Sequence, residues 1–506
     1  MLLDLSTVGG IFLALLPEIV LTVWALALML AIAWKHGQPG YQRQVGLATV
    51  SGLVAALIAV LWLWTRQAAP SGLPMMIALD TFRYAIAVVF LLGAIATVLL
   101  SLEYLARERI DVPEYYVLIL FATIGMMLMG GGADLIVIFL GLELMSVSVY
   151  VLAGIRRRSG ASAEAALKYF LLGAFASAFL LYGIALVYGA TGSTNIVAVA
   201  FQIADSGITH SPLLVVGAAM LLIGFGFKVA AVPFHMWAPD AYDGAPTPIT
   251  AFMAAAVKAA AFAALARVMV LALGGALDVW QDAVWWLAAI TMVAGNLMAL
   301  AQRHLKRMLA YSAIAHAGYL LAAVASGTPV GGAAFLFYAF AYTLMTIGAF
   351  AVLISAGRGG ESDVRIDQFN GLATERPWLA FAMAVFMLSL LGFPGTAGFI
   401  GKWYILTATV DANQVVLAVI LVLASVVSAG YYLPVIMNMY MRPVDAERRE
   451  PEGAYRLPGA ARAVVGVAVV LLLLFGVWPN RVLSIVDDGG RDLRPPTIMA
   501  STAGPR

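Results

Sequence analysis

Long apolar runs recur along almost the whole chain, and they restrict its fold more than any other feature. A helix needs about 20 mostly apolar residues to cross the hydrocarbon of a bilayer. Inside lipid, only helices and closed barrels satisfy all their backbone hydrogen bonds. Runs of this length predict about 14 transmembrane helices in an all-α integral membrane protein, at 11–34, 45–65, 75–103, 114–130, 132–155, 162–190, 211–236, 246–275, 281–301, 306–326, 331–357, 376–409, 412–440 and 461–485.

The composition agrees with a surface that faces lipid. Charged residues make up only 11% of the chain, whereas soluble domains carry roughly 25%. The net charge of +2 argues against a nucleic-acid partner. The absence of Cys excludes disulfides and thiolate-held iron–sulfur clusters in this chain. The five His are scattered, so none forms a spacing that would hold a metal.

The basic residues predict the orientation of the chain. Most of the 29 Lys and Arg fall in segments that follow odd-numbered spans, for example at 156–158 and 303–307. Basic loops stay on the cytoplasmic side, so both termini are predicted on the outer, periplasmic side. The longest connections, 357–375 and 441–460, are too short to contain a soluble domain. The tail from 486 is polar, and we expect it to be loose.

Two units of five spans follow three N-terminal helices in residues 1–113. The units occupy 114–275 and 281–440, and the last helix at 461–485 carries a polar tail to 506. Five is odd, so tandem units must have opposite orientations, as in many transporters. The fourth spans share a local motif, Gly-Phe-Gly-Phe-Lys ending at Lys228 and Gly-Phe-Ile-Gly-Lys ending at Lys402. Nearby prolines, Pro233 and Pro394, predict kinks in both helices.

Among the titratable residues inside predicted spans, five are the main candidates for a site within the membrane: Glu143, Lys228, Lys258, His316 and Lys402. A charge at mid-membrane costs about 2.5–3.5 kcal/mol on insertion scales. Structural ion pairs between helices are the alternative explanation, but one Glu cannot neutralise three Lys. Burial favours the neutral form of an amine, and His titrates near neutral pH. The set therefore indicates groups that take up and release protons within the membrane.

Two further residues have weaker signals. Lys168 lies four residues after Glu164, a spacing that equally fits a surface ion pair. His235 follows Pro233, where a capping or interfacial role is as good an interpretation as a proton relay. Three charges near predicted outer helix ends are interpreted as anchors: Asp80, Arg83 and Arg267.

Two stretches carry a family resemblance. Pro-Phe-His-Met-Trp-Ala-Pro-Asp-Ala-Tyr at 233–242, with Gly-Ala-Pro-Thr-Pro at 244–248, resembles the signature of the antiporter-like subunits of respiratory complex I. The stretch 306–319, which contains His316, is similar to the same family. The first stretch is most similar to the subunit N group. Ala313 stands where the family pattern has a second Ser.

The resemblance implies broken seventh and twelfth helices and a proton relay. Glu143 and Lys228 would form a pair, Lys258 would be the central relay, and His316 would bridge toward Lys402. Lys168 and His235 match family positions.

The resemblance also implies an assembly in a bacterial cytoplasmic (inner) membrane that passes electrons from NADH to quinone. No cofactor would bind this chain; FMN, the iron–sulfur clusters and the quinone would bind partner subunits. Those partners would include antiporter-like subunit M and the small subunits K and J.

Two other functions remain open. A subunit of a multisubunit cation/proton antiporter would share the Glu and Lys pattern. A solute transporter would instead need a substrate-sized polar cavity at the midplane, whereas this sequence offers a row of titratable groups on successive helices.

Overall fold

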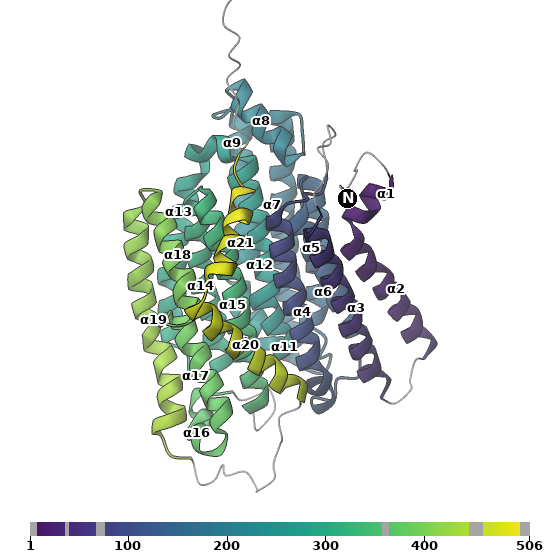
Figure 1. Cartoon of the computed structure of the whole chain (residues 1–506), viewed down its shortest axis with the longest axis vertical. Coiled ribbons are helices and arrows are strands. Elements are labelled where there is room, and N and C mark those ends of the chain that lie inside the picture. Colours follow the sequence, from purple (N-terminus) through teal and green to yellow (C-terminus); the bar gives the residue numbers. More distant parts are fainter. Residues whose placement is uncertain (1–7, 36–39, 67–75, 357–363, 445–458, 496–506) are drawn as a thin grey trace, which may run out of the picture.

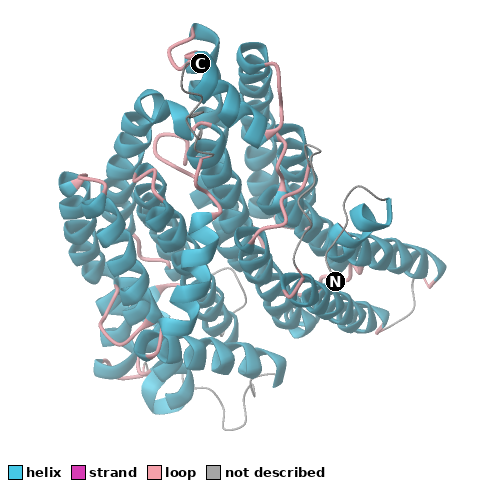
Figure 2. Ribbon diagram, turned by 45° about the horizontal axis from the view of Figure 1, so that its top comes forward, coloured by secondary structure: helices cyan, strands magenta, loops and turns pink. Residues whose placement is uncertain are grey.

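The computed structural model describes residues 8–35, 40–66, 76–356, 364–444 and 459–495, and all regular elements in these ranges are helices (Figure 2). Within them, 13 helical segments are long and apolar enough to cross a membrane. The remaining predicted span, 376–409, is divided into two shorter helices, Pro377–Leu391 and Ala397–Asp411. The prediction of an all-α membrane fold with about 14 spans is confirmed.

The helices follow one another in four groups along the chain (Figure 1). The N-terminal group contains α1 (Val8–Ala14), α2 (Leu16–Trp34), α3 (Tyr41–Trp64) and α4 (Thr81–Arg107). The first five-span unit contains α5 (Glu114–Gly131), α6 (Leu135–Ala153), α7 (Gly160–Thr191), α8 (Ile196–Ser206), α9 (Pro212–Val229), α10 (Trp237–Gly244), α11 (Thr247–Phe252), the π-helix η1 (Met253–Val257), α12 (Lys258–Ala266) and the π-helix η2 (Arg267–Ala272).

The second unit begins after the 3₁₀ turn η3 (Gly274–Ala276). It contains α13 (Leu277–Leu300), α14 (Leu305–Ala325), α15 (Pro329–Ala356), the 3₁₀ turn η4 (Ile366–Phe369), α16 (Leu372–Glu375), α17 (Pro377–Leu391), α18 (Ala397–Asp411) and α19 (Val415–Met441). The C-terminal group contains α20 (Gly459–Val477) and α21 (Asn480–Arg491). Parts of the predicted connections 357–375 and 441–460, and the tail from 496, lie outside the described residues.

Corresponding helices of the two units pack in the same way. α5 packs on α6 as α13 packs on α14, and α7 packs on α9 as α15 packs on α17 and α18. The helices of the α5–α6 pair and of the α13–α14 pair approach each other closely because glycines lie against the neighbouring backbone. A Cβ built at Gly125 would lie 2.5 Å from the Gly141 carbonyl oxygen, and one at Gly295 would lie 2.5 Å from the Ala315 nitrogen. Small residues at such contacts let membrane helices approach closely.

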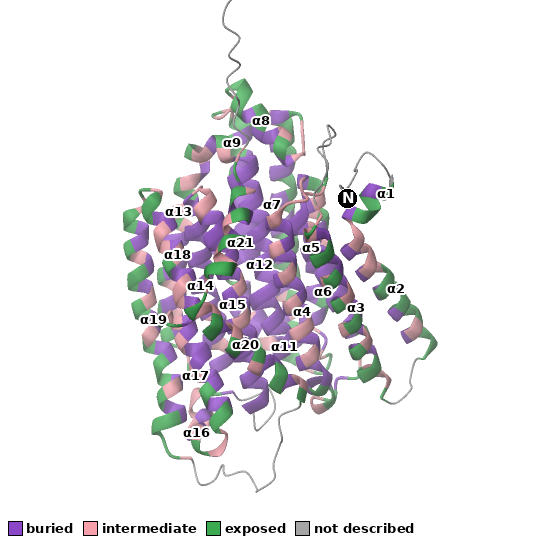
Figure 3. Cartoon of the chain, in the orientation of Figure 1, coloured by how far each residue is buried: buried purple, intermediate pink, exposed green. Residues whose placement is uncertain are grey.

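The eighth span, Thr247–Ala272, lies at the centre of the bundle (Figure 3). The most apolar part of this span is completely buried inside the bundle. The sequence reason is its alanine content: short side chains allow neighbouring helices to cover it on all sides. The predicted helix 246–275 is interrupted by η1 and η2, the first of which ends directly before Lys258. π-segments within α-helices often occur at functional sites.

The prediction of a loose tail from 486 is wrong for the residues described. Helix α21 continues to Arg491 and packs on α4 and α15. Gly489 and Gly490 permit this contact: a Cβ at Gly490 would lie 2.3 Å from the Pro329 carbonyl oxygen. Helix α8 is not among the predicted helices; it buries Ile196, Val199 and Ile203 on one face.

Candidate functional site

The five predicted intramembrane residues lie on five different helices: α6, α9, α12, α14 and α18. Lys228 is 5% exposed, Lys258 2%, His316 1% and Lys402 6%, while Glu143 is half-buried. Such burial is rare for amines unless they have partners. The site is therefore defined by what each side chain contacts.

Glu143 and Lys228 do not form a direct ion pair in the part of the chain that the structure describes. Glu143 Oε1 accepts a hydrogen bond of 2.5 Å from Ser177 on α7. Lys228 Nζ donates to Ser146 Oγ at 2.8 Å and to the Tyr150 hydroxyl at 3.1 Å. Ser146 and Tyr150 lie three and seven residues after Glu143, on the same face of α6. The Glu143 carboxylate is thus within electrostatic range of the Lys228 amine, while the direct hydrogen-bond partners of the amine are the hydroxyls of Ser146 and Tyr150.

The seventh helix breaks directly after Lys228. α9 ends at Val229, and Ala230 adopts the left-handed conformation with φ of 59°. The indole of Trp237 donates to the Phe227 carbonyl at 2.9 Å, which satisfies a group at the helix end. Val232 N–H donates to Thr291 on α13 at 2.9 Å, so the break is tied to the second unit.

Lys258 joins the two units. Its Nζ donates to the Ala313 carbonyl of α14 at 2.6 Å and lies 5.7 Å from the centroid of the Tyr242 ring. A buried ammonium needs hydrogen-bond acceptors. The Lys258 amine therefore binds the backbone of α14, the helix that carries His316.

His316 lies between tyrosines from α15 and α19. Its Nδ1 is 2.6 Å from the Tyr338 hydroxyl, and its Nε2 is 3.0 Å from the Tyr432 hydroxyl. Tyr432 also hydrogen-bonds Ser312 on α14. The amines of Lys258 and Lys402 both lie within electrostatic range of the ring.

Lys402 lies in the second broken helix. α17 ends at Leu391, and the carbonyl of that residue accepts from Lys402 Nζ at 3.0 Å. The amine also lies 4.7 Å from the centroid of the Tyr319 ring. The break precedes Lys402 but follows Lys228, so the equivalence of the two lysines within the repeats stays a prediction. Beside Lys402 is an apolar crevice of about 460 Å³ that includes Phe399, Trp403 and Leu421.

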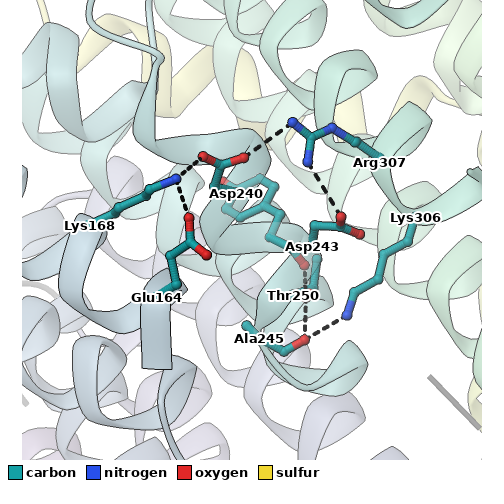
Figure 4. A network of polar contacts seen from close by, with 9 residues as sticks. Glu164, Lys168, Asp240, Asp243, Ala245, Thr250, Lys306 and Arg307 are labelled. Atoms are coloured by element: carbon teal, nitrogen blue, oxygen red, sulfur yellow. Dashed lines mark hydrogen bonds and ion pairs between the residues drawn. The ribbon is translucent and has the colours of Figure 1, made fainter. Parts of the chain in front are cut away.

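Lys168 belongs to a separate polar network (Figure 4). It contacts Glu164 at 2.6 Å and Asp240 at 2.7 Å. Arg307 contacts Asp240 at 3.2 Å and Asp243 at 3.4 Å. The hydrogen bond from Lys168, together with the nearby cations, lowers the pKa of Asp240. A cavity of about 470 Å³ is lined by Glu164, Asp240, Asp243 and Arg307 of this network and by Arg156 and Ser159.

His235 stands apart from that network. It lies in the turn between α9 and α10, half-buried, and its Nδ1 has no hydrogen-bond partner among the residues that the structure describes. The structure therefore brings Lys168 to the acidic α10 segment, and it leaves His235 near the break.

The charges interpreted as anchors form buried ion pairs. Arg267 binds both carboxylate oxygens of Asp80, at 2.7 and 3.0 Å. Arg83 contacts Glu18 at 2.8 Å, so the carboxylate inside the first predicted span has a partner on α4. Asp492 accepts a hydrogen bond from Phe82 N–H at 3.1 Å, and burial raises its pKa to about 6.

Sequence reasoning places Ser312 on the same face of its helix as His316, but it missed five other hydroxyls of the site: Ser146, Tyr150, Ser177, Tyr338 and Tyr432. Tyr occurs 19 times in the chain, and nothing in the spacing of these residues marks them. Among the residues that the structure describes, no group of three or more His, Asp or Glu is arranged to hold a metal ion. The arrangement offers proton donors and acceptors.

Comparisons with known proteins bear on this site. Residues 132–428 match a family described as NADH:quinone oxidoreductase/Mrp antiporter, TM. The NADH-quinone oxidoreductase subunit N of Gemmatimonas aurantiaca is 47% identical over 519 residues, covering 99% of this chain and 98% of the relative. The protein of the same name from Trichlorobacter lovleyi is 48% identical over 434 residues, covering 86% and 88%.

Solved structures give the same fold. A chain of respiratory complex I from Thermus thermophilus with bound aureothin matches with a TM-score of 0.79 and 39% identity, covering 94% of this chain and 100% of that one. A chain of the Mrp complex from Dietzia matches with a TM-score of 0.81, covering 95% and 97%. At 22% identity, the second likeness concerns the fold alone.

Proposed function

Because the chain belongs to the family of NADH:quinone oxidoreductase and Mrp antiporter transmembrane subunits, we propose that it is a proton-translocating membrane subunit of NADH:quinone oxidoreductase. Protons move through a mid-membrane relay of Glu143, Lys228, Lys258, His316 and Lys402. The movement is coupled to quinone reduction elsewhere in the complex.

One observation carries the proposal: three buried amines and one buried imidazole span both units, and their hydrogen-bond partners are hydroxyls and carbonyls. Lys228 has Ser146 and Tyr150, Lys258 has Ala313, and Lys402 has Leu391. A permanent ion pair would hold each amine in its charged form. Neutral partners bind both the charged and the neutral amine, so each lysine can gain and lose a proton.

The surroundings of the subunit follow from the same proposal. It sits in a bacterial cytoplasmic (inner) membrane with both termini on the periplasmic side, as the basic segments favour. Its partners are the other membrane subunits, including antiporter-like subunit M and the small subunits K and J. FMN, the iron–sulfur clusters and the quinone bind elsewhere; this chain has no Cys to hold a cluster. Lys168 and His235 have supporting roles toward the cytoplasmic side.

The family description favours a second candidate, a subunit of a multisubunit cation/proton antiporter. Both candidates use the same buried charges, so the partners that co-purify with the chain separate them. Flavin and iron–sulfur absorbance in the purified assembly supports the oxidoreductase, and their absence supports the antiporter.

A pair of glutamates provides the test of the relay. Glu143 is a half-buried carboxylate inside α6, whereas the side chain of Glu164 is 62% exposed and bonds Lys168. We expect Glu143→Gln to lower proton pumping per NADH oxidised in membrane vesicles more than Glu164→Gln does. The amount of assembled complex and its quinone reduction are measured on the same vesicles. Equal pumping by both variants would refute the relay role of Glu143.

A further inference from the structure

The two ring nitrogens of His316 are both occupied by buried tyrosine hydroxyls. Tyr338 reaches Nδ1 from α15, and Tyr432 reaches Nε2 from α19. Both tyrosines are 0% exposed. Tyr432 also bonds Ser312, which is 2% exposed and lies one helical turn before His316. Four side chains from three helices therefore form one continuous hydrogen-bonded chain, Ser312–Tyr432–His316–Tyr338.

The two ends of this hydrogen-bonded chain lie near different lysines. Ser312 is the neighbour of Ala313, whose carbonyl accepts from Lys258 at 2.6 Å. At the other end, Tyr338 packs against Gly401: a Cβ built there would lie 2.5 Å from the tyrosine ring. Lys402 follows Gly401 directly. The chain thus runs from the neighbourhood of the first unit's central lysine to that of the terminal lysine.

The chemistry of imidazole makes such a chain directional. Neutral imidazole has one N–H and one bare nitrogen, so it accepts a hydrogen bond from one tyrosine and donates one to the other. Reversing the direction of every hydrogen bond exchanges the two tautomers. A chain of this kind has two equivalent states that differ in which end can accept a proton.

We propose that Tyr338 and Tyr432 are relay residues that carry protons between Lys402 and Lys258 through His316. As a proton arrives at Tyr338, this residue passes its own hydroxyl proton to Nδ1. Nε2 releases its proton to Tyr432, and Tyr432 passes its hydroxyl proton to Ser312. Ser312 in turn releases its own hydroxyl proton toward the neutral amine of Lys258. One bond to hydrogen breaks and one forms at each group, so His316 ends neutral in the other tautomer. The opposite direction uses the same steps.

This inference rests on the proposed function, because it assumes that His316 belongs to a proton path. The competing explanation is that the hydroxyls only satisfy a buried ring. A hydroxyl that is merely structural should be replaceable with the same effect as other buried hydroxyls nearby. The chain supplies such controls next to each relay residue.

Two matched pairs of Tyr→Phe variants test the inference. Tyr431 neighbours Tyr432 on α19. Its hydroxyl donates to Asn296 at 2.8 Å and also contacts the Tyr432 hydroxyl, but as a side branch and not as one of the links between Ser312 and Tyr338. Tyr342 stacks on the His316 ring with centroids 4.9 Å apart, but its hydroxyl bonds Thr346. Each control therefore loses a buried, hydrogen-bonded hydroxyl of the same region without breaking the chain.

The measurement is the number of protons pumped per NADH oxidised by the whole complex in membrane vesicles, with His316→Leu as the reference. We expect Tyr432→Phe and Tyr338→Phe to lower this quotient as far as His316→Leu does. Tyr431→Phe and Tyr342→Phe should keep the wild-type quotient. Ser312→Ala removes only one small hydroxyl and provides the same test should either Phe variant fail to assemble.

The outcomes separate the inference from the proposed function. A low quotient in His316→Leu with wild-type quotients in Tyr432→Phe, Tyr338→Phe and Ser312→Ala would overturn the hydroxyl chain and leave the relay intact. Equal losses in both members of each pair would also overturn it, because the hydroxyls would then be structural. A wild-type quotient in His316→Leu itself would overturn the path through His316 and the inference with it.

Discussion

Replacing Asp80 by Ala should destabilise the subunit by about 4 kcal/mol, because it removes one partner of a buried ion pair. The Arg267 side chain is 1% exposed, and its guanidinium also donates to the Gly130 carbonyl at 3.2 Å. Leaving a buried charge without its partner costs about 3–5 kcal/mol, and we take the lower end because Asp80 is 19% exposed. Asp80 also caps α4 by accepting from Arg83 N–H at 2.8 Å, and losing a cap costs about 1 kcal/mol.

Thermal inactivation of the purified complex measures this loss. With an unfolding entropy of about 2.1 cal/mol/K per residue, 4 kcal/mol in a chain of 506 residues corresponds to a midpoint lowered by about 4 °C. Arg267→Met should cost about 3 kcal/mol for the same reason. The double variant should lose less than the sum of the two, since it leaves neither charge alone.

The matched control is Asp278→Ala. Asp278 contacts His210 at 3.3 Å, but these side chains are 59% and 78% exposed. Exposed ion pairs contribute about 0–1 kcal/mol, so this variant should leave the midpoint nearly unchanged. If Asp80→Ala and Arg267→Met lower the midpoint no further than Asp278→Ala does, or if the losses of the double variant are additive, the pair does not hold these helices together.

Two further perturbations test the packing and the C-terminal contact. Burial raises the pKa of Asp492 to about 6 from 3.8, so the folded state binds this proton more tightly than the unfolded state does. The stability of the subunit should therefore fall as pH rises from 3.8 to about 6 and level off at higher pH. Asp492→Asn should abolish this dependence between about pH 4 and pH 6, measured as inactivation midpoints; a retained dependence would place its origin elsewhere. Gly125→Ala should lower the midpoint, although Ala favours helix by about 1 kcal/mol over Gly, because its Cβ would meet the Gly141 carbonyl oxygen at 2.5 Å. Gly466→Ala, with nothing within 4 Å, should not lower it, and equal effects of the two would show that the close approach is unimportant.

Much of the architecture is determined by the sequence, because lipid imposes a simple rule on it. A backbone without water must be helical, so apolar runs of sufficient length predict the spans. In the part of the chain that the structure describes, 13 of them are helices long enough to cross. The same rule makes Lys228, Lys258, His316 and Lys402 visible, since a titratable residue inside such a run is conspicuous. The prolines at 233 and 394 indicated the two breaks because proline cannot complete the helix hydrogen-bond pattern.

The contacts of those residues were decided only by the tertiary structure. The resemblance implied a pair of Glu143 and Lys228, yet the amine binds Ser146 and Tyr150 while the carboxylate binds Ser177. Hydropathy does not register this difference, since Ser and Tyr occur throughout membrane helices as packing and interfacial residues.

Distance along the chain is the physical reason that the sequence stops at this point. Tyr432 lies 116 residues from His316 and Tyr338 lies 22 residues from it, so their meeting depends on how α14, α15 and α19 pack. Helix α21 shows the same limit: its polar sequence indicated a loose tail, but two glycines let it approach α15 closely. Polarity along the sequence determined which residues enter the membrane, and side-chain packing between distant helices determined which of them touch.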